Sequence, residues 1–261
     1  GRFKGQIVTT LNPITTEMGA LRPSLLPELL KVIAHNQNHG QTAIKLFEFG
    51  RVHTKRKTNL SVVGDYTEIE TLLVGAAGHW ASHGWYGEAR EVDIFAVKGL
   101  VDLVLSSAGV RDVRYVDTDS DSVFSQSVDV FSGKRWIGVV AGISHKIATE
   151  VDLRSTAFIA ELDWTAICEL VSDHLRVRYL AVSRHPVVER DIAVVVDAAQ
   201  PAGPMLEAIR RAGQPLLQDV TVFDVYEGEN VGAKQKSVAF GLSLGADRTL
   251  RDKDVDKTVS K

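Results

Sequence analysis

The sequence predicts an α+β protein with two domains, and three observations lead to this fold class. The 261 residues give room for two domains of ordinary size. Their composition, 44% hydrophobic and 24% charged, is that of a globular protein. Segments with the apolar spacing of helices are interspersed with segments that have the two-residue period of strands, and those strands follow one another in the manner of antiparallel sheets.

The first predicted helix covers residues 24–39. Ser24 is the expected N-cap, Pro27 lies in the first turn, and Gly40 ends the helix. Four apolar residues with three- and four-residue spacing form its stripe: Leu26, Leu29, Leu30 and Ile33.

The rest of the first domain combines strands and helices. Strands are expected at residues 44–53 and 70–78, and a helix within residues 92–110. Residues 127–144 read as a hairpin with its turn at residues 132–134. A strand from residue 156 then runs into an apolar helix, in which Cys168 is expected to be buried.

A second domain is predicted after a break near Pro186, which divides the chain into residues 1–183 and 184–261. Its elements follow the order β-α-β-β-α: strands at 190–197, 219–228 and 235–245, and helices at 203–213 and from 249 onward, where Thr249 and Asp252 have capping-box spacing. These are five of the six elements of a ferredoxin-like unit. The closing strand has no counterpart in the sequence, so a fragment or another occupant of that sheet edge is expected.

The alternation of side chains predicts which residues face away from the two helices of this domain. Phe223 and Val225 are expected to face the helices, as are the apolar residues of the third strand. The opposite face carries small residues with one aromatic ring and one carboxylate: Ala193, Asp224, Tyr226 and Ser237. A planar ligand could stack on Tyr226 while Asp224 accepts hydrogen bonds from it, as in RNA-binding sheets. Packing of this face against the first domain is an equal alternative.

Several kinds of chemistry are excluded by the sequence. The single cysteine forms no internal disulfide and suits a reducing, cytoplasmic setting. No apolar run has the length of a membrane span, and a net charge of −3 argues against a broad basic nucleic-acid field. His35 and His39 lack the glutamate and third ligand of a zinc protease. Ser144 and His145 lack a nucleophile elbow. No catalytic residue, metal site or cofactor is therefore predicted.

Seven stretches in order resemble the C-terminal part of the beta subunit of bacterial phenylalanine–tRNA ligase. They are "LNPITTEMGALRPSLLPELLKVIAHNQNHG", "KLFEFGRVH", "VDIFAVKG", "FIAELD", "HPVVERDIAVVVD", "VFDVYEG" and "KSVAFGLSL…DRTL". The resemblance spans nearly the whole chain. It implies a class II synthetase-like antiparallel sheet domain followed by a truncated ferredoxin-fold anticodon-binding domain, excised from a longer subunit.

The resemblance also implies sites and partners. Asp224 and Tyr226 would contact the first anticodon base of phenylalanine tRNA, with Ser237 and Ala193 lining the same site. The alpha subunit, in an alpha2beta2 heterotetramer, would bind the helix that carries Leu26, Leu29, Leu30 and Ile33, although core packing alone also explains this stripe.

The first domain is not expected to form an aminoacyl-adenylate. The segment "AFIAELDWTAI" occupies the place of the third class II motif but has neither its glycines nor its arginine, and adenylyl transfer needs such fixed cations. ATP and Mg²⁺ would then belong to the holoenzyme. Two alternatives remain: a regulatory small-molecule-binding protein, since fold does not fix function, and an independent ligase.

Overall fold

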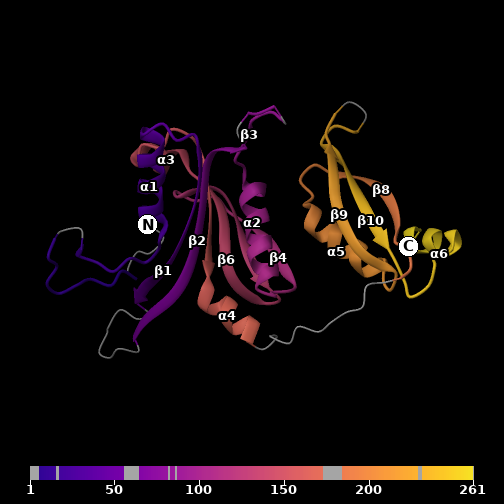
Figure 1. Cartoon of the computed structure of the whole chain (residues 1–261), viewed down its shortest axis with the longest axis horizontal. Helices are drawn as coiled ribbons and strands as arrows, with labels where there is room; N and C mark the ends of the chain where they lie inside the picture. The colour runs from indigo at the N-terminus through magenta and orange to yellow at the C-terminus, as the bar shows by residue number, and fades with distance from the viewer. Residues whose placement is uncertain are drawn as a thin grey trace. The chain divides into compact units, whose positions relative to one another are not determined.

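The structure is a computed structural model that describes residues 6–15, 18–55, 65–81, 83–85, 87–172, 184–228 and 231–260. The chain divides into two compact units, residues 1–177 and 178–261 (Figure 1). The predicted boundary between residues 183 and 184 falls at the end of a stretch outside the described residues.

Seven strands of the first unit form an antiparallel sheet within the described residues. Six of them follow the order β1-β2-β7-β6-β5-β4, and β3 pairs with β2. The strands are β1 (Ala43–Lys55), β2 (Tyr66–Ala81), β3 (Arg90–Glu91), β4 (Val113–Thr118), β5 (Phe124–Ser132), β6 (Arg135–Ile143) and β7 (Ala157–Asp163). The predicted hairpin is the β5–β6 pair, with Gly133 at a φ of +57° in its turn. The two short strands β3 and β4 were not predicted.

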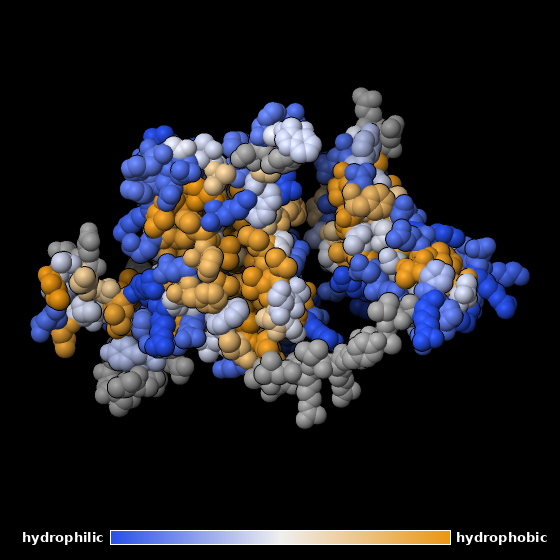
Figure 2. Space-filling view, in the orientation of Figure 1, coloured by the Kyte–Doolittle hydropathy of each residue, from blue (hydrophilic) through white to orange (hydrophobic). Residues whose placement is uncertain are grey.

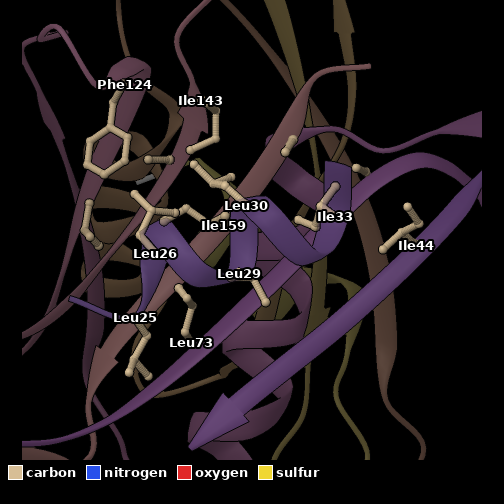
Figure 3. Packing of buried hydrophobic residues seen from close by; sticks show 14 of the residues in the cluster. Leu25, Leu26, Leu29, Leu30, Ile33, Ile44, Leu73, Phe124, Ile143 and Ile159 are labelled. Carbon is tan, nitrogen blue, oxygen red and sulfur yellow. The ribbon is translucent and has the colours of Figure 1, made fainter. Parts of the chain in front are cut away.

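Helices cover both faces of this sheet, as Figure 1 shows. The helices α1 (Leu26–Asn38) and α3 (His145–Glu150) pack on one face, and α2 (Ile94–Ser107) and α4 (Trp164–Ser172) pack on the other. The α1 side is a closely packed hydrophobic layer, in which residues of α1 such as Leu29 and Leu30 cluster with Leu73, Ile159 and the Phe124 ring of the sheet (Figure 3). The sheet therefore separates two hydrophobic cores, one on each of its faces.

The start of α1 is fixed by a strand from the other end of the unit. Ser24 Oγ accepts a hydrogen bond from the Leu26 N–H at 3.1 Å and donates one to Glu161 Oε1 of β7 at 2.7 Å. The same carboxylate oxygen accepts from the Leu25 N–H at 3.1 Å. The helix begins at Leu26 with Leu25 as its N-cap, so the prediction that Ser24 is the N-cap is wrong by one residue, although the Ser24 hydroxyl still accepts from the first helical N–H. Gly40 follows the end of the helix with a φ of +86°.

The second unit has the predicted β-α-β-β-α order. Its elements are β8 (Val188–Asp197), α5 (Ala202–Ala212), β9 (Leu217–Tyr226), β10 (Gln235–Leu244) and α6 (Asp252–Val259). The strands form an antiparallel sheet of order β8-β10-β9, which is the ferredoxin-like arrangement without its fourth strand. The fold class predicted from the sequence is thus confirmed for both units.

The last helix starts differently from the prediction. It begins at Asp252, with Arg251 as its N-cap, and not at Thr249. The Asp254 carboxylate accepts hydrogen bonds from the Arg248 guanidinium at 2.7 Å and from the Arg251 N–H at 3.4 Å. An acidic side chain in the first turn therefore accepts a hydrogen bond from a free N–H. Its negative charge also interacts favourably with the positive end of the helix dipole. Within the described residues, no helix is both long and apolar enough to cross a membrane.

Candidate nucleic-acid interface

One face of the second unit is closed by its helices. The apolar residues of the central strand β10 are buried there against α5, α6 and the flanking strands: Val238, Phe240, Leu242 and Leu244. Met205 and Ile209 of α5 and Val255 of α6 belong to the same core. Because successive side chains of a strand point to opposite faces, the residues between these four lie on the other, helix-free face. We call this the open face.

The register of the three strands places the predicted site residues in two adjacent rows across the open face. Tyr226 of β9 pairs with Ser237 of β10, which pairs with Val195 of β8. In the next row, Asp224 pairs with Ala239, and Ala239 pairs with Ala193. The four predicted residues Asp224, Tyr226, Ser237 and Ala193 therefore come from all three strands and share one face.

Tyr226 is the largest side chain of these two rows. Its side chain is 42% exposed. Gly228 lies beside it, and a Cβ at that position would overlap the tyrosine hydroxyl. Because Gly228 has no side chain, the Tyr226 ring can occupy this position without a steric clash.

A β-bulge in β9 corrects one sequence prediction. Asp224 pairs with Ala239, whereas Val222 pairs with Phe240, so Phe223 is an extra residue without a partner on β10. The Phe223 ring does not enter the helix-side core; it is 58% exposed. Its Cδ1 lies 3.7 Å from the position that a Cβ of Gly241 would take, on the open face. The prediction that Phe223 faces the helices is wrong, because the bulge turns it to the opposite side.

A third row, which the sequence prediction did not include, surrounds this ring. Thr221 pairs with Gly241, and Gly241 pairs with Asp191. The Thr221 Oγ1 and an Asp191 carboxylate oxygen lie 3.4 and 3.8 Å from the position of a Gly241 Cβ. Glycine leaves a shallow floor there, with an aromatic ring, a hydroxyl and a carboxylate around it. The sequence carries one sign of the bulge: Val222 and Phe223 are adjacent and both apolar, which interrupts the alternation of apolar and polar residues along β9.

The open face is acidic. Asp191 and Asp224 stand on it, Glu189 and Asp219 lie in the fourth row, and no lysine or arginine lies in these four rows. Within the described part of the chain, neither Asp191 nor Asp224 has a hydrogen-bonding or ionic partner, so both carboxylates can accept hydrogen bonds from a ligand. From Arg184 onward the chain has 11 basic and 12 acidic residues, a net charge of −1. Such a face repels phosphates but suits the amino and imino edges of nucleic-acid bases.

The stripe of α1 lies inside the first unit. Leu26, Leu29, Leu30 and Ile33 are between 0% and 7% exposed and pack against the sheet. Core packing, the alternative that the sequence left open, therefore accounts for all four side chains. The outward side of the helix includes Val32, which is 46% exposed.

The described residues of the first unit at the positions where the resemblance suggests ATP contacts are engaged within the fold. The Arg51 guanidinium is engaged by Glu68 at 3.0 Å and Glu70 at 3.6 Å. On the α1 side of β2, a Cβ at Gly75 would lie 2.5 Å from Leu29 Cδ2, so aliphatic side chains fill that part of the sheet surface. Glu161, in the segment that takes the place of the third motif, accepts hydrogen bonds from residues that precede α1.

Other residues considered in the sequence have local structural roles. Ser144 is not on a strand: it caps α3 by accepting from the Ile147 N–H at 3.4 Å, and its hydroxyl donates to the Ser122 carbonyl at 2.9 Å. The rings of His35 and His39 lie 4.2 Å apart between centroids. The prediction that Cys168 is buried is wrong, because it lies on the exposed side of α4. Among the described residues, no three His, Cys, Asp or Glu side chains converge as metal ligands.

An apolar groove of about 700 Å³ lies on the other side of the first sheet, between β1, β2 and α2. Its walls include Phe47 and Phe49, which are 72% and 54% exposed, and Leu103, which is 61% exposed. Figure 2 shows hydrophobic surface on the side of this unit that carries these elements. The groove contains no cluster of ionisable groups that would suit catalysis.

Comparison with known proteins assigns both units. Residues 3–164 match the family model of the phenylalanyl tRNA synthetase beta chain CLM domain, and residues 183–261 match that of the ferredoxin-fold anticodon binding domain. The chain is 44% identical over 264 residues to the phenylalanine–tRNA ligase beta subunit of Salinibacter ruber, and 32% identical over 252 residues to that of Bacillus subtilis. A solved pyrrolysyl tRNA synthetase from Desulfitobacterium hafniense aligns with a TM-score of 0.49 and 16% identity, over 66% of this chain and 55% of that one.

The two beta-subunit matches cover 98% and 95% of this chain, and 32% and 30% of the relatives. The chain thus spans less than a third of the length of these curated relatives. The two family models follow each other along the chain in the order of the two structural units, and the first alone covers more than half of the residues. The chain therefore belongs to the family of phenylalanyl-tRNA synthetase beta chains.

Proposed function

We propose that this chain is the part of a phenylalanine–tRNA ligase beta subunit that recognises the anticodon of phenylalanine tRNA. The observation that carries the proposal is the pair of rows on the open face, in a unit that matches an anticodon-binding family. Tyr226 stacks on the first anticodon base, and Asp224 accepts hydrogen bonds from its edge. Ser237 and Ala193 form the floor beside them. Base stacking on an aromatic side chain contributes about 1–3 kcal/mol.

The acidic charge of the open face determines how the RNA is oriented. Bases are held against the sheet by stacking and hydrogen bonds, while their phosphates point away from Asp191 and Asp224. The isolated chain therefore binds weakly, and the remainder of a cytoplasmic holoenzyme supplies most of the affinity. Specificity comes from the open face.

The first unit supports the alpha subunit of an alpha2beta2 enzyme and does not itself catalyse adenylate formation. ATP and Mg²⁺ act in the holoenzyme, at a site outside this chain. Because Leu26, Leu29, Leu30 and Ile33 are occupied by the core, they contribute to this contact by holding α1 in place, and the outward side with Val32 faces the partner. We expect no exchange above background when the chain is incubated with phenylalanine, ATP and pyrophosphate, whereas measurable exchange would make it an independent ligase.

The anticodon proposal is tested by a double-mutant cycle. Binding of the chain to phenylalanine tRNA is measured by fluorescence anisotropy at low salt, for the wild type and Tyr226→Ala, each with native tRNA and with tRNA changed at the first anticodon base. If the tyrosine reads that base, each change weakens binding and the two together add little to either alone. Wild-type binding that neither change affects would place the RNA elsewhere. A metabolite-binding protein would show no tRNA-dependent change at Tyr226.

A further inference from the structure

Phe223 has a position that the anticodon contacts proposed above leave unexplained. Its ring is 58% exposed on the open face although the neighbouring strand residue Val222 contributes to the core. A single exposed aromatic ring is common on protein surfaces. This ring, however, is turned to the open face by a bulge, and it lies next to Gly241, whose missing side chain leaves the floor flat.

The distance between Phe223 and Tyr226 suits two neighbouring bases. The two residues are separated by three positions on the same strand, and a strand rises about 3.3 Å per residue, so their Cα atoms are at most roughly 10 Å apart, and the bulge shortens this. RNA-binding sheets stack two or three successive unpaired bases on aromatic residues of neighbouring positions. The open face has two such rings, at 58% and 42% exposure.

Polar groups beside Phe223 can contact the edge of a second base. The Asp191 carboxylate and the Thr221 hydroxyl both lie at the same glycine floor, within 4 Å of the position of a Gly241 Cβ. A carboxylate accepts hydrogen bonds from an exocyclic amino group, and a hydroxyl both donates and accepts. The arrangement repeats, one row further along the sheet, the pairing of a ring with a carboxylate that Tyr226 and Asp224 provide.

We propose that Phe223 is a second base-stacking residue, which holds an unpaired anticodon-loop base next to the one that Tyr226 and Asp224 contact. Asp191 and Thr221 contact the edge of that second base, which favours a base with an exocyclic amino group. The inference rests on the anticodon function proposed above. The full ligand surface then covers three rows of the sheet, from Val195 to Asp191 along β8.

The test uses the 261-residue chain and anticodon stem-loop hairpins of phenylalanine tRNA, each with the fluorescent base 2-aminopurine at one anticodon position. Stacking on a protein ring changes the fluorescence of that base. Phe223→Ala is expected to abolish the change at one position adjacent to the first anticodon base and to weaken binding roughly 5- to 150-fold. Tyr226→Ala abolishes the change at the first position. Phe223→Leu, which keeps apolar bulk without a π-face, behaves like the alanine variant.

Phe95→Ala is the matched control, because Phe95 is 75% exposed in the first unit and its loss should change neither signal. The inference is overturned if Phe223→Ala leaves all three positions and the affinity unchanged while Tyr226→Ala still acts; the proposed function then stands. It is also overturned if Phe223→Leu binds like the wild type, because the ring then serves only as apolar cover. Failure of the wild-type chain to bind any hairpin overturns both the inference and the proposed function.

Discussion

Glu161 of β7 accepts a hydrogen bond from the Ser24 hydroxyl at 2.7 Å, although the two residues lie 137 positions apart in the chain. Through this contact, a central strand of the first sheet holds the start of the helix that covers it. Ser24 is 5% exposed, and the Leu25 N–H shares the same carboxylate oxygen.

We expect Glu161→Ala to lower the free energy of unfolding of the first unit by about 1–3 kcal/mol, because it leaves a buried hydroxyl and a backbone N–H unsatisfied. All four tryptophans of the chain, Trp80, Trp85, Trp136 and Trp164, lie in this unit, so denaturant unfolding followed by tryptophan fluorescence reports on it alone. Glu150→Ala, at an exposed carboxylate at the end of α3, is the control and should change stability by less than about 0.5 kcal/mol. Equal effects of the two variants would contradict this role of Glu161.

Two phenylalanines of the second unit should differ sharply in their contribution to stability. Phe240 is fully buried between the sheet and the helices, and its replacement by alanine is expected to cost about 3–5 kcal/mol. Phe223→Ala should cost less than about 1 kcal/mol, because the ring is 58% exposed on the open face. Amide hydrogen exchange in β10 measures the loss of stability in each of the two variants. A large loss of protection in Phe223→Ala would mean that this ring belongs to the core.

The acidic open face predicts a weak dependence of RNA binding on salt. The slope of log K against log salt is about −0.7 per phosphate contacted on a single strand, and no basic residue lies in the four rows of the face. We therefore expect a slope smaller in magnitude than about 2 for the chain with an anticodon stem-loop. Anisotropy titrations at several salt concentrations measure this slope. A steep slope would show that a basic surface elsewhere, and not the open face, supplies the binding energy.

Acid should weaken the attachment of α6. The pKa of the Asp254 carboxyl is lowered chiefly by the hydrogen bond from the Arg248 guanidinium and, to a smaller extent, by the one from the Arg251 N–H. A carboxyl with a lowered pKa in the folded state stabilises that state above its unfolded pKa, about 3.9, and this stabilisation is lost as the pH falls through the folded pKa.

The stability difference between the wild type and Asp254→Asn should therefore be present at neutral pH and shrink below about pH 4. Hydrogen exchange in α6 at several pH values measures this difference. Asp256→Asn, at an exposed position of the same helix, is the matched control. A difference that stays constant into acid would mean that the Asp254 side chain acts through its shape and not through its charge.

The regular parts of the fold could be predicted because one period persists through each of them. The stripe of α1 and the alternation of β10 identified both elements and their buried faces. The helix α3 has only six residues and β4 only six, too short for a period to emerge. Cys168 was misplaced because most residues of α4 are apolar, so its sequence does not distinguish the buried side from the exposed one.

The candidate site was predicted in part for the same reason. The shared face of Asp224, Tyr226, Ser237 and Ala193 follows from alternation within uninterrupted parts of their strands. Phe223 was misplaced because a bulge interrupts the alternation, and pairing partners, not residue types, reveal it. Asp191 was missed because a carboxylate on an outer strand looks like an ordinary solvated residue until its neighbours across the sheet are known.

The bulge in β9 has a consequence for how the open face is encoded. In an uninterrupted strand, the alternation that buries Val220 and Val222 would send Asp224 and Tyr226 toward the helices as well. One additional residue shifts the phase, so the first part of the strand can anchor the core while the last part presents its polar groups outward. The number of residues between Val222 and Asp224 thus matters as much as their identity. Insertion or deletion of one residue there would turn the side chains of Asp224 and Tyr226 to the opposite face of the sheet without altering either of them.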